Sequence, residues 1–514
     1  MTLHTSISFI DRKNMIRKGK INSRGDILVT ALIFAAIVIT VTVGLVNWGA
    51  TLFNNIRTVA QKEQALQIAE AGVDYYRWHL AHAPLDFQDG TGTTGPYVHQ
   101  MYDKDGNLIG SYSLAIVPPL LGSTIVNITS TGTLASSTIS RSIKVVMAIP
   151  SLAQYAMITN SVVYYGAGDS IFGPIRSNIG VGFWNASPQP IAHNLVSSAS
   201  ATMTDSTSCG GSTVHFGVYT CVPGTGYPSG DPAPTSTAST PPNRPDVFVS
   251  GRQMSVPVID FTSISSDLSA IKASAQSAGF YRGASGASGY KIVLKTNGTF
   301  DLYKVNSLLA APSGCTNSQT QAGWGPWSIN INGSGVEQTT LLGNYAIPAN
   351  GLMFFEDNIW VEGQINHSRL TIAAGAFPVN PATYKNITVN NNLTYTNFDG
   401  TDAIGLIAQG NFLVGLVSAN NLTIDGALVA QNGGTIRYYY NSSCRVNATN
   451  YYTRSTLTTY GMFASNGQGY FYYGSSGYTS QPATYDANLL YGPPPSFPLT
   501  SSFYSTLSWQ EVSP

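Results

Sequence analysis

The stretch that decides the fold is RGDILVTALIFAAIVITVTVGLVNWGATLFNNIRTVAQKEQALQIAEAGVDYYRWHL, residues 24–80. A basic tail precedes its glycine, and no charged residue occurs from Ile27 to Ile56. About 20 apolar residues cross the hydrocarbon core of a bilayer, so this run is long enough to span one. Residues 1–25 carry six basic residues against one acid, which predicts that they stay cytoplasmic and that the rest of the chain lies outside.

The apolar run, Ile27 to Phe53, continues without a proline into a second helical segment. There the apolar residues recur at steps of three and four and form one stripe: Ile56, Val59, Ala60, Leu66, Ala69, Val73, Tyr76 and Leu80. The pattern predicts one helical rod of about 80 Å, roughly half of it beyond the membrane. A secretory signal peptide has a much shorter apolar core, so the alternative is an uncleaved signal anchor with a helical stalk.

The combination of four motifs resembles the type IV pilins and pseudopilins, most closely the PilX-like minor pilins. These motifs are Arg24-Gly25, Leu28 to Leu32, Gln64 to Leu66 and Ala69 to Gly72, the last including Glu70. The resemblance implies that a prepilin peptidase cuts after Gly25 and leaves Asp26 as the mature N-terminus, which is often methylated. It also implies that an inner-membrane assembly platform inserts the helix among other pilins in a filament.

One residue departs from that family. Shaft-forming members carry Glu at the fifth mature position, whereas this chain has Thr30. A carboxylate in hydrocarbon needs a partner charge, but a threonine hydroxyl bonds to a carbonyl of its own helix. The resemblance therefore implies a low-copy subunit, placed where no neighbour's terminal amine has to be neutralised.

The composition is that of an exported protein. Only 10% of the residues are charged, and cleavage after Gly25 would leave 19 basic against 24 acidic residues, a net charge of −5. There is thus no basic face that indicates a nucleic-acid partner.

Residues 85–150 predict a small antiparallel sheet that packs on the stem helix as a pilin-like head. The segments Tyr97 to Tyr102 and Leu108 to Val117 flank an Asp-Gly turn, and Ile125 to Thr131 and Ser140 to Met147 alternate apolar and polar residues. The segment Asp103 to Asn107 could instead begin a calcium loop, although the closing Glu is missing.

The four cysteines lie in the exterior part of the chain, where the oxidising environment favours disulfides. Cys209 and Cys221 are close in sequence, and Cys315 and Cys444 could form a second bridge, but four cysteines allow three pairings. No Cys-x-x-Cys or Cys-x-x-His spacing favours a zinc site, and no metal or cofactor is predicted.

Beyond residue 150 the chain is expected to be almost entirely β-structure, with one helix at 262–278 that ends at Gly279. From about Gly351 short units recur: Leu406-Ile-Ala-Gln recurs as Leu428-Val-Ala-Gln, and Leu-Thr-Ile occurs at both Leu370 and Leu422. Steps of roughly 17 to 22 residues predict the coils of a right-handed β-helix, with the Asn residues between strands stacked in amide ladders. A flat or sandwich sheet is the alternative.

No motif predicts catalysis. The acids between 351 and 460 are thinly spread, and no Gly-x-Ser-x-Gly elbow, P-loop or metal-type histidine pair is present. Candidate rings for stacking on a host surface or a glycan are Tyr438, Tyr440, Tyr470 and Tyr472, although alternate side chains of such runs point into the core.

The predicted fold class is α+β, with a long transmembrane and stem helix, a small antiparallel head and a large all-β exterior. The expected divisions are a leader at 1–25, a helix at 26–84, a head at 85–150, a Ser/Thr/Gly/Pro-rich β and loop region at 151–250 and a β-helix-like domain at 251–514. The predicted protein is a single-pass minor pilin that acts in filament assembly and surface adhesion. The alternative is a signal-anchored β-helical adhesin outside any filament.

Overall fold

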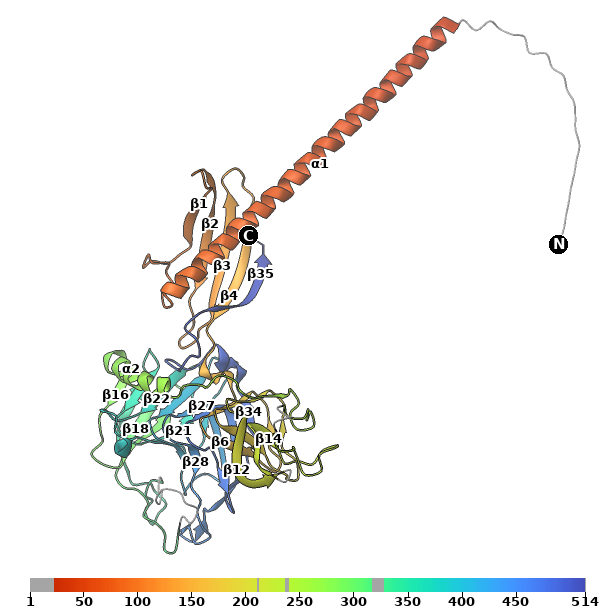
Figure 1. Cartoon of the computed structure of the whole chain (residues 1–514). Coiled ribbons are helices and arrows are strands. Elements are labelled where there is room, and N and C mark those ends of the chain that lie inside the picture. Colours follow the sequence, from red (N-terminus) through yellow and green to blue (C-terminus); the bar gives the residue numbers. More distant parts are fainter. Residues whose placement is uncertain (1–22, 210–211, 236–239, 317–327, 514) are drawn as a thin grey trace, which may run out of the picture.

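The computed structural model describes residues 23–209, 212–235, 240–316 and 328–513. Most of the predicted leader lies outside the described residues, apart from Ser23 to Gly25. Helix α1 spans Ser23–His82, 60 residues without interruption, and projects from the body as a rod (Figure 1). The prediction of one continuous helix is confirmed, and a large β-rich region follows it. Within the described residues, α1 is the one helix long and apolar enough to cross a membrane.

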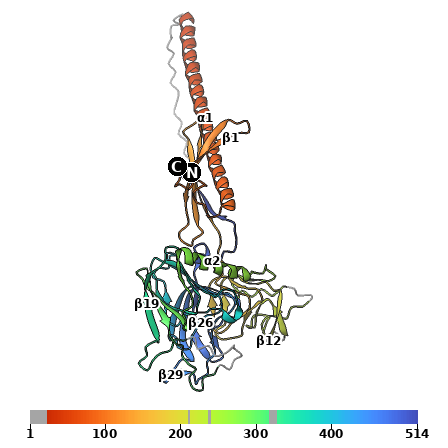
Figure 2. The ribbon, with the colours of Figure 1, turned by 90° about the vertical axis from the view of Figure 1, so that its left-hand side faces the viewer.

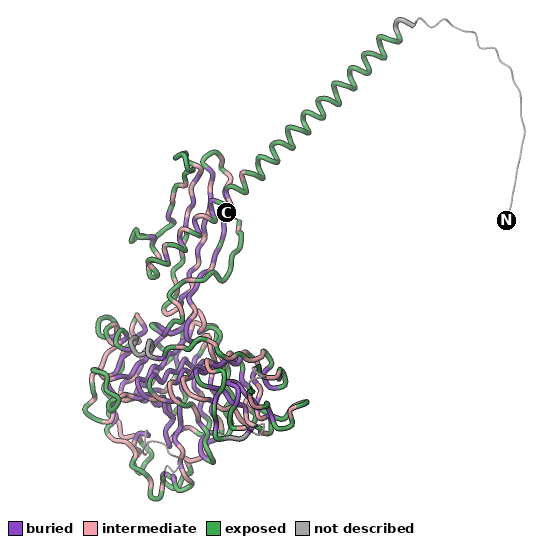
Figure 3. The backbone as a smooth tube through the Cα atoms, in the orientation of Figure 1, coloured by how far each residue is buried: buried purple, intermediate pink, exposed green. Residues whose placement is uncertain are grey.

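The two halves of α1 have different surroundings. Every residue from Asp26 to Ala60 is exposed, and Figure 3 shows this half standing free. From Ala65 onward one face is buried against the head: Ala65, Ile68, Ala69, Val73, Tyr76 and Leu80. Of the predicted stripe, Ala69, Val73, Tyr76 and Leu80 lie on this buried face, together with Ala65 and Ile68. The earlier members Ile56, Val59 and Ala60 are exposed, because the head reaches only the second half of the helix.

The head sheet covers the buried face of α1. Its strands β1 (Tyr97–Tyr102), β2 (Leu108–Val117), β3 (Val126–Leu134) and β4 (Ser140–Ala148) pair antiparallel in chain order. Alternate residues of β3 are buried, as expected for a sheet with one face on a core. The strands predicted from the Asp-Gly turn and the alternating runs are confirmed.

The fifth strand of the head comes from the other end of the chain. Strand β35 (Ser505–Val512) pairs antiparallel with β4, with Trp509 opposite Val145. The sequence-based division places the whole of 251–514 in the exterior domain, and for Ser505–Val512 the structure corrects it. Pairing between strands so distant in sequence has no local signal, and it makes the exterior region an insertion between β4 and β35.

Gly132 in β3 sets how closely the sheet approaches α1. A Cβ at this position would lie 2.2 Å from the Ala65 carbonyl oxygen and 2.5 Å from the Ala69 nitrogen. These are helix backbone atoms, so α1 would have to shift. We expect Gly132→Ala to destabilise the head by about 3 kcal/mol in chemical unfolding. Gly166→Ala is the control, because a Cβ at Gly166 meets nothing within 4 Å. Equal stability of the two variants would contradict the packing.

The exterior region is built on stacked parallel strands. Strand β16 (Phe280–Arg282) is followed in space by β20 (Leu352–Phe355), β22 (Arg369–Ala374), β25 (Ala403–Ala408), β27 (Asn421–Ala430) and β31 (Thr453–Ser465). Partners between β20 and β31 lie 19 to 35 residues apart, from Leu352 opposite Thr371 to Asn421 opposite Thr456. The spacing is wider than the predicted 17 to 22 residues, because the loops between strands differ in length.

A second parallel stack lies beside the first. It contains β17 (Gly289–Leu294), β21 (Ile359–Gln364), β23 (Ile387–Thr388), β26 (Phe412–Val414) and β28 (Thr435–Arg437). A continuous apolar core joins the two stacks. At one turn, the Asn386 and Asn411 backbone N–H groups donate to the side-chain oxygens of Asn358 and Asn386, at 2.9 and 2.7 Å. The predicted asparagine ladder is confirmed.

The first stack continues past β31 with strands from earlier in the chain. β31 pairs with β5 (Met157–Thr159), which leads to β8 (Ile175–Ser177), β11 (Val196–Ser198) and β15 (Arg252–Gln253). The ladder thus crosses the expected boundary near residue 250. Helix α2 (Thr262–Ala278), as predicted, then leads the chain to β16 at the other end of the stack (Figure 2).

Helix α2 lies along the side of the stack. Its Leu268, Ile271 and Ala275 pack with Leu352 and Phe354 of β20. The Gly279 N–H donates to the Ala275 carbonyl at 3.1 Å and ends the helix. The remaining strands flank the stacks: β6 (Val162–Tyr165), β7 (Ser170–Ile171), β9 (Gly180–Phe183), β10 (Ile191–Ala192), β12 (Thr202–Cys209), β13 (Ser212–Phe216), β14 (Val218–Thr220), β18 (Thr299–Val305), β19 (Thr339–Ala346), β24 (Leu393–Thr394), β29 (Arg445–Val446), β30 (Thr449–Asn450), β32 (Tyr472–Tyr473), β33 (Ser476–Ser480) and β34 (Ala483–Tyr485).

Arg369 fastens the head to the exterior region. Its guanidinium donates to the carbonyls of Leu121 (2.6 Å), Gly492 (2.6 Å) and Pro493 (2.7 Å), and also to that of Gly400. Leu121 lies in the β2–β3 loop of the head, and residues 492–493 lie in the segment that returns to β35. One side chain therefore joins a loop of the head and the segment that returns to β35 to the exterior region.

Candidate functional site

The start of α1 carries the predicted processing and assembly residues. Gly25 lies in the first turns of the helix, and Asp26 is exposed. The Thr30 hydroxyl donates to the Asp26 carbonyl oxygen at 2.7 Å. The predicted bond to a helix carbonyl is confirmed, and Thr30 needs no partner charge.

The exposed half of α1 presents a long, continuous apolar surface. Its large side chains, from Ile27 (70% exposed) to Val59 (66%), have no contact with the body. A contiguous apolar surface of this extent marks contact with a membrane or with another protein. We therefore treat residues 26–60 as the principal candidate site.

The end of the AEAG motif connects this surface to the head. Glu70 is exposed, whereas Gly72 is buried where α1 crosses the sheet. A Cβ at Gly72 would lie 2.4 Å from the Ser130 hydroxyl oxygen and 2.8 Å from the Tyr112 ring. Gly72 thus permits the close approach of helix and sheet, while Glu70 remains free to meet solvent or a neighbouring protein.

Two disulfides hold the exterior loops. The structure joins Cys209 to Cys221 and Cys315 to Cys444. The first bridge ties the end of the β12–β13 hairpin to the segment after β14. The second spans 129 residues of the chain and fixes the loop at Cys315 to the distal end of the stacks.

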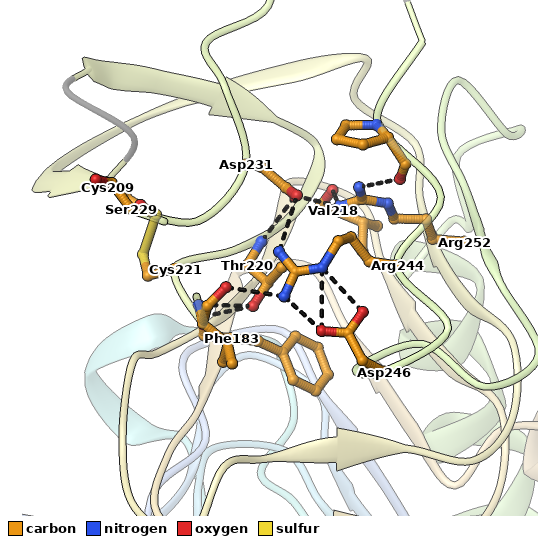
Figure 4. A network of polar contacts seen from close by, with 12 residues as sticks. Phe183, Cys209, Val218, Thr220, Cys221, Ser229, Asp231, Arg244, Asp246 and Arg252 are labelled. Atoms are coloured by element: carbon orange, nitrogen blue, oxygen red, sulfur yellow. Dashed lines mark hydrogen bonds and ion pairs between the residues drawn. A yellow bond between two sulfur atoms is a disulfide. The ribbon is translucent and has the colours of Figure 1, made fainter. Parts of the chain in front are cut away.

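A buried ion network lies beside the first disulfide (Figure 4). Asp231 accepts from Arg252 and from the Thr220 backbone N–H (3.0 Å), and its other oxygen lies 3.7 Å from Arg244. Arg244 also pairs with Asp246 at 2.7 Å. The two cations meet two carboxylates, so the network fixes the Pro-rich loop to β14 and leaves no charge to attract a ligand. Sequence analysis missed it, because its members are isolated in a low-charge segment.

The carboxylates between 351 and 460 have local partners. Glu362 accepts from Lys291 at 2.9 Å and from Asn391 at 2.7 Å, beside a shallow cavity of about 320 Å³. Asp402 accepts from the Ser368 and Thr396 backbone N–H groups at 2.9 and 3.0 Å. Glu356 pairs with Lys272, Asp357 binds Ser285 and Lys385, and Asp399 binds Thr401. These contacts fix loops and strand ends.

Asp425 is also buried, and its carboxylate lies beside the Tyr395 backbone. It accepts from the Tyr395 backbone N–H at 2.9 Å. Burial, and to a lesser degree the Asp486 charge, raise the pKa of Asp425 to about 6. A folded pKa above the unfolded value of about 3.9 means that the folded state holds the proton more tightly. The contribution of Asp425 to stability is thus fully present below pH 4 and is lost as the pH rises through about 6.

The Asp425→Asn variant tests this titration. Since an asparagine keeps the acceptor but carries no charge, we expect it to gain up to about 3 kcal/mol of unfolding free energy at pH 7.5 and almost nothing at pH 4. Denaturant unfolding at the two pH values measures the difference. Asp399→Asn is the control, because Asp399 is exposed. An Asp425→Asn gain that is the same at both pH values would contradict the assigned titration.

The structure separates the four candidate tyrosines. Tyr438 and Tyr440 are 9% and 0% exposed, so the prediction that they bind at the surface is wrong and they belong to the core. Tyr470 is half-buried, and Tyr472 is 42% exposed. Tyr473, which the sequence did not single out, is equally exposed. The surface rings are thus gathered on β32.

The loop Asp103 to Asn107 closes on itself. The Asp103 carboxylate accepts from the backbone N–H groups of Asp105 (2.9 Å) and Asn107 (2.8 Å) and from the Asn107 side chain (3.0 Å). These bonds lower the pKa of Asp103. They are the contacts of a tight turn, and among the described residues no group of three or more His, Cys, Asp or Glu side chains could hold a metal ion.

No model of a known protein family matches this sequence, and no curated protein matches it. Among solved structures, the chain is similar to the competence-associated pilin ComZ from Thermus thermophilus. That alignment covers 88% of this chain and 97% of the pilin, with a TM-score of 0.31 and 13% sequence identity. Values this low carry no argument about fold or function.

Proposed function

We propose that this chain is a type IV pilin-like subunit of the PilX-like minor class, processed after Gly25 and held in a filament by α1. The observation that carries the proposal is the division of α1 into a bare apolar half and a half packed on a five-stranded head. A membrane anchor needs about 20 apolar residues but no rigid helix beyond them. A filament subunit needs the apolar run and also the rigid helix that continues it, because its helix leaves the bilayer and must then be covered by other helices.

The same proposal explains the glycine and the threonine. The basic tail before Gly25 would hold the leader in the cytoplasm until a prepilin peptidase removes it. Thr30, which bonds within its own helix, offers no carboxylate to a neighbouring amine. A place at the filament tip fits, since no subunit follows there. The partners are then other pilins, the peptidase and the assembly platform in the inner membrane.

We infer that the stacked strands of the exterior region form a β-helix. Support comes from the all-parallel ladder, the second parallel stack beside it and the asparagine ladder at one turn. A right-handed coil is expected, because parallel crossover connections are almost always right-handed. The insertion between β4 and β35 would place this β-helix on the outside of the filament as an adhesive module rather than an enzyme.

Photo-crosslinking along α1 tests the proposed role. A benzophenone side chain in place of Val46, which is 65% exposed, should crosslink to other pilins in sheared surface filaments. The same group in place of Val258, 71% exposed in the exterior region, is the control and should give no such product. Products at position 46 that contain only lipid or membrane proteins would instead favour the signal-anchored adhesin.

A further inference from the structure

Strands β28 and β29 lie at the end of the exterior region far from α1 (Figures 1 and 2), and several tyrosines lie near them in the sequence and on β32, with Tyr470 bridged to Ile436 of β28. We propose that this tyrosine face, defined as Tyr439, Tyr452, Tyr470, Tyr472 and Tyr473, binds an acidic polysaccharide. The inference deepens the proposed adhesive function by naming its ligand class. It does not depend on filament assembly, because the face is complete within one chain.

The rings stand on a rigid base. Tyr472 and Tyr473 lie opposite Gly477 and Ser476 in the β32–β33 hairpin, and each is 42% exposed. The Tyr470 and Tyr473 ring centroids are 5.5 Å apart. Phe471, between them in sequence, is buried in the core, so the strand turns its polar-tipped rings outward.

Neighbouring layers add the other two rings. The Gly477 N–H donates to the Tyr452 carbonyl at 2.9 Å, which fixes Tyr452 beside the hairpin. At the hairpin turn, a Cβ on Gly474 would lie 3.2 Å from the Tyr439 ring, so that ring rests on the turn. Tyrosines from three parts of the chain thus lie around this hairpin and offer flat faces and hydroxyl tips, which suit stacking on sugar rings.

The charge of this region selects an anionic ligand. From Gly426 to Tyr485 the chain contains no Asp, Glu or Lys but three arginines, Arg437, Arg445 and Arg454. Arg437 is 1% exposed and Arg454 8%. Arg437 donates to the Tyr451 and Tyr452 carbonyls, and Arg454 donates to the Ser418 carbonyl. Within the described chain, neither has an ion-pair partner, and the Nε of each lacks a hydrogen-bond acceptor.

The two buried charges are therefore uncompensated, and the third arginine, Arg445, is exposed on β29. Neutral aromatic rings also pack on the cations: the Arg437 guanidinium lies 4.9 Å from the Tyr440 ring centroid and the Arg454 guanidinium 4.5 Å from that of Tyr451. Positive charge in a low-dielectric base reaches the surface with little screening. A polymer of uronic acids offers both a stacking face and a carboxylate in each unit.

The binding test uses the full chain in detergent micelles, immobilised and exposed to polygalacturonate, neutral dextran and single-stranded DNA. We expect polygalacturonate to bind at least tenfold more tightly than dextran, and the affinity to fall as salt is added. The double variant Tyr472→Ser, Tyr473→Ser should lose about tenfold in affinity, and Arg445→Gln about threefold. The matched controls, on the head, are Tyr102→Ser and Lys104→Gln, which should bind as the unmodified chain does.

Several results would overturn the proposal. They are equal affinity for dextran and polygalacturonate, tighter binding of DNA than of either polysaccharide, no binding at all, or equal losses in the head controls. Unchanged melting temperatures of the variants exclude unfolding as the cause of a loss. If the double variant melts early, Arg445→Gln alone decides, since Arg445 is exposed. Filament incorporation is scored separately in cells, so failure of the pilin assignment leaves this result unaffected.

Discussion

Gly25→Val is expected to leave the chain uncut and absent from surface filaments. A prepilin peptidase that requires a small residue before the cleaved bond would not accept the branched side chain, so the basic tail would remain attached. A charged tail cannot follow the helix into an apolar filament core, because its charges would lose their hydration there. We expect near-complete loss, measured as the intact mass of the protein in membranes and its amount in the sheared fraction.

Gly44→Val is the matched control for processing. Gly44 lies in the same helix, and a Cβ there meets nothing within 4 Å. The same substitution at this position should leave the mass of the processed chain changed only by the side chain. Normal cleavage of the Gly25→Val protein, or failure of cleavage in both variants, would contradict the assignment of Gly25.

Removing the long-range disulfide is expected to have the largest effect on stability. The variant Cys315→Ala, Cys444→Ala frees a loop whose ends are separated by 129 residues. In the chain-entropy model this loss is about 5 kcal/mol of unfolding free energy. Denaturant unfolding monitored by tyrosine fluorescence measures it, because Tyr438 and Tyr440 are buried near Cys444.

The second disulfide provides the comparison. Cys209 and Cys221 are only 12 residues apart, so the variant Cys209→Ala, Cys221→Ala should lose about 3 kcal/mol. A larger loss from the short bridge than from the long one would show that the loop at Cys315 does not depend on its covalent link. Polysaccharide binding at the tyrosine face should weaken in the Cys315→Ala, Cys444→Ala variant but not in the Cys209→Ala, Cys221→Ala variant. The reason is that Asn441, beside Cys444, donates to the Gly314 carbonyl at 3.1 Å and so links this region to the loop at Cys315.

Local patterns predicted the elements whose partners are close in sequence. Helix α1, strands β1 and β2 and helix α2 begin and end at or near their expected residues. Each segment contains its own helical or alternating pattern of apolar residues, so its secondary structure can be predicted without knowing its partners. The Asn358, Asn386 and Asn411 ladder was also predictable, because stacked turns repeat one residue type at one position.

Long-range order was not predictable. Met157 lies opposite Phe463, and β35 closes the head more than 350 residues after β4, with the Ser505 hydroxyl donating to the Ala148 carbonyl at 3.2 Å. The residues of one segment do not indicate which distant segment it will pair with. The sequence also does not show which tyrosines of a run face the core. Tyr438 and Tyr440 are buried, and Tyr439 between them is at intermediate exposure. The inward side chains are those that pack with Cys444 and, for Tyr440, with Arg437.

The most direct test of the central proposal is the N-terminal residue and intact mass of the protein recovered from the sheared surface fraction of its own cells. The pilin assignment predicts a chain that starts at Asp26, lacks residues 1–25 and is released together with filaments. A chain that still carries its basic tail and is found only in membranes would contradict it, and would identify an anchored β-rich surface protein instead.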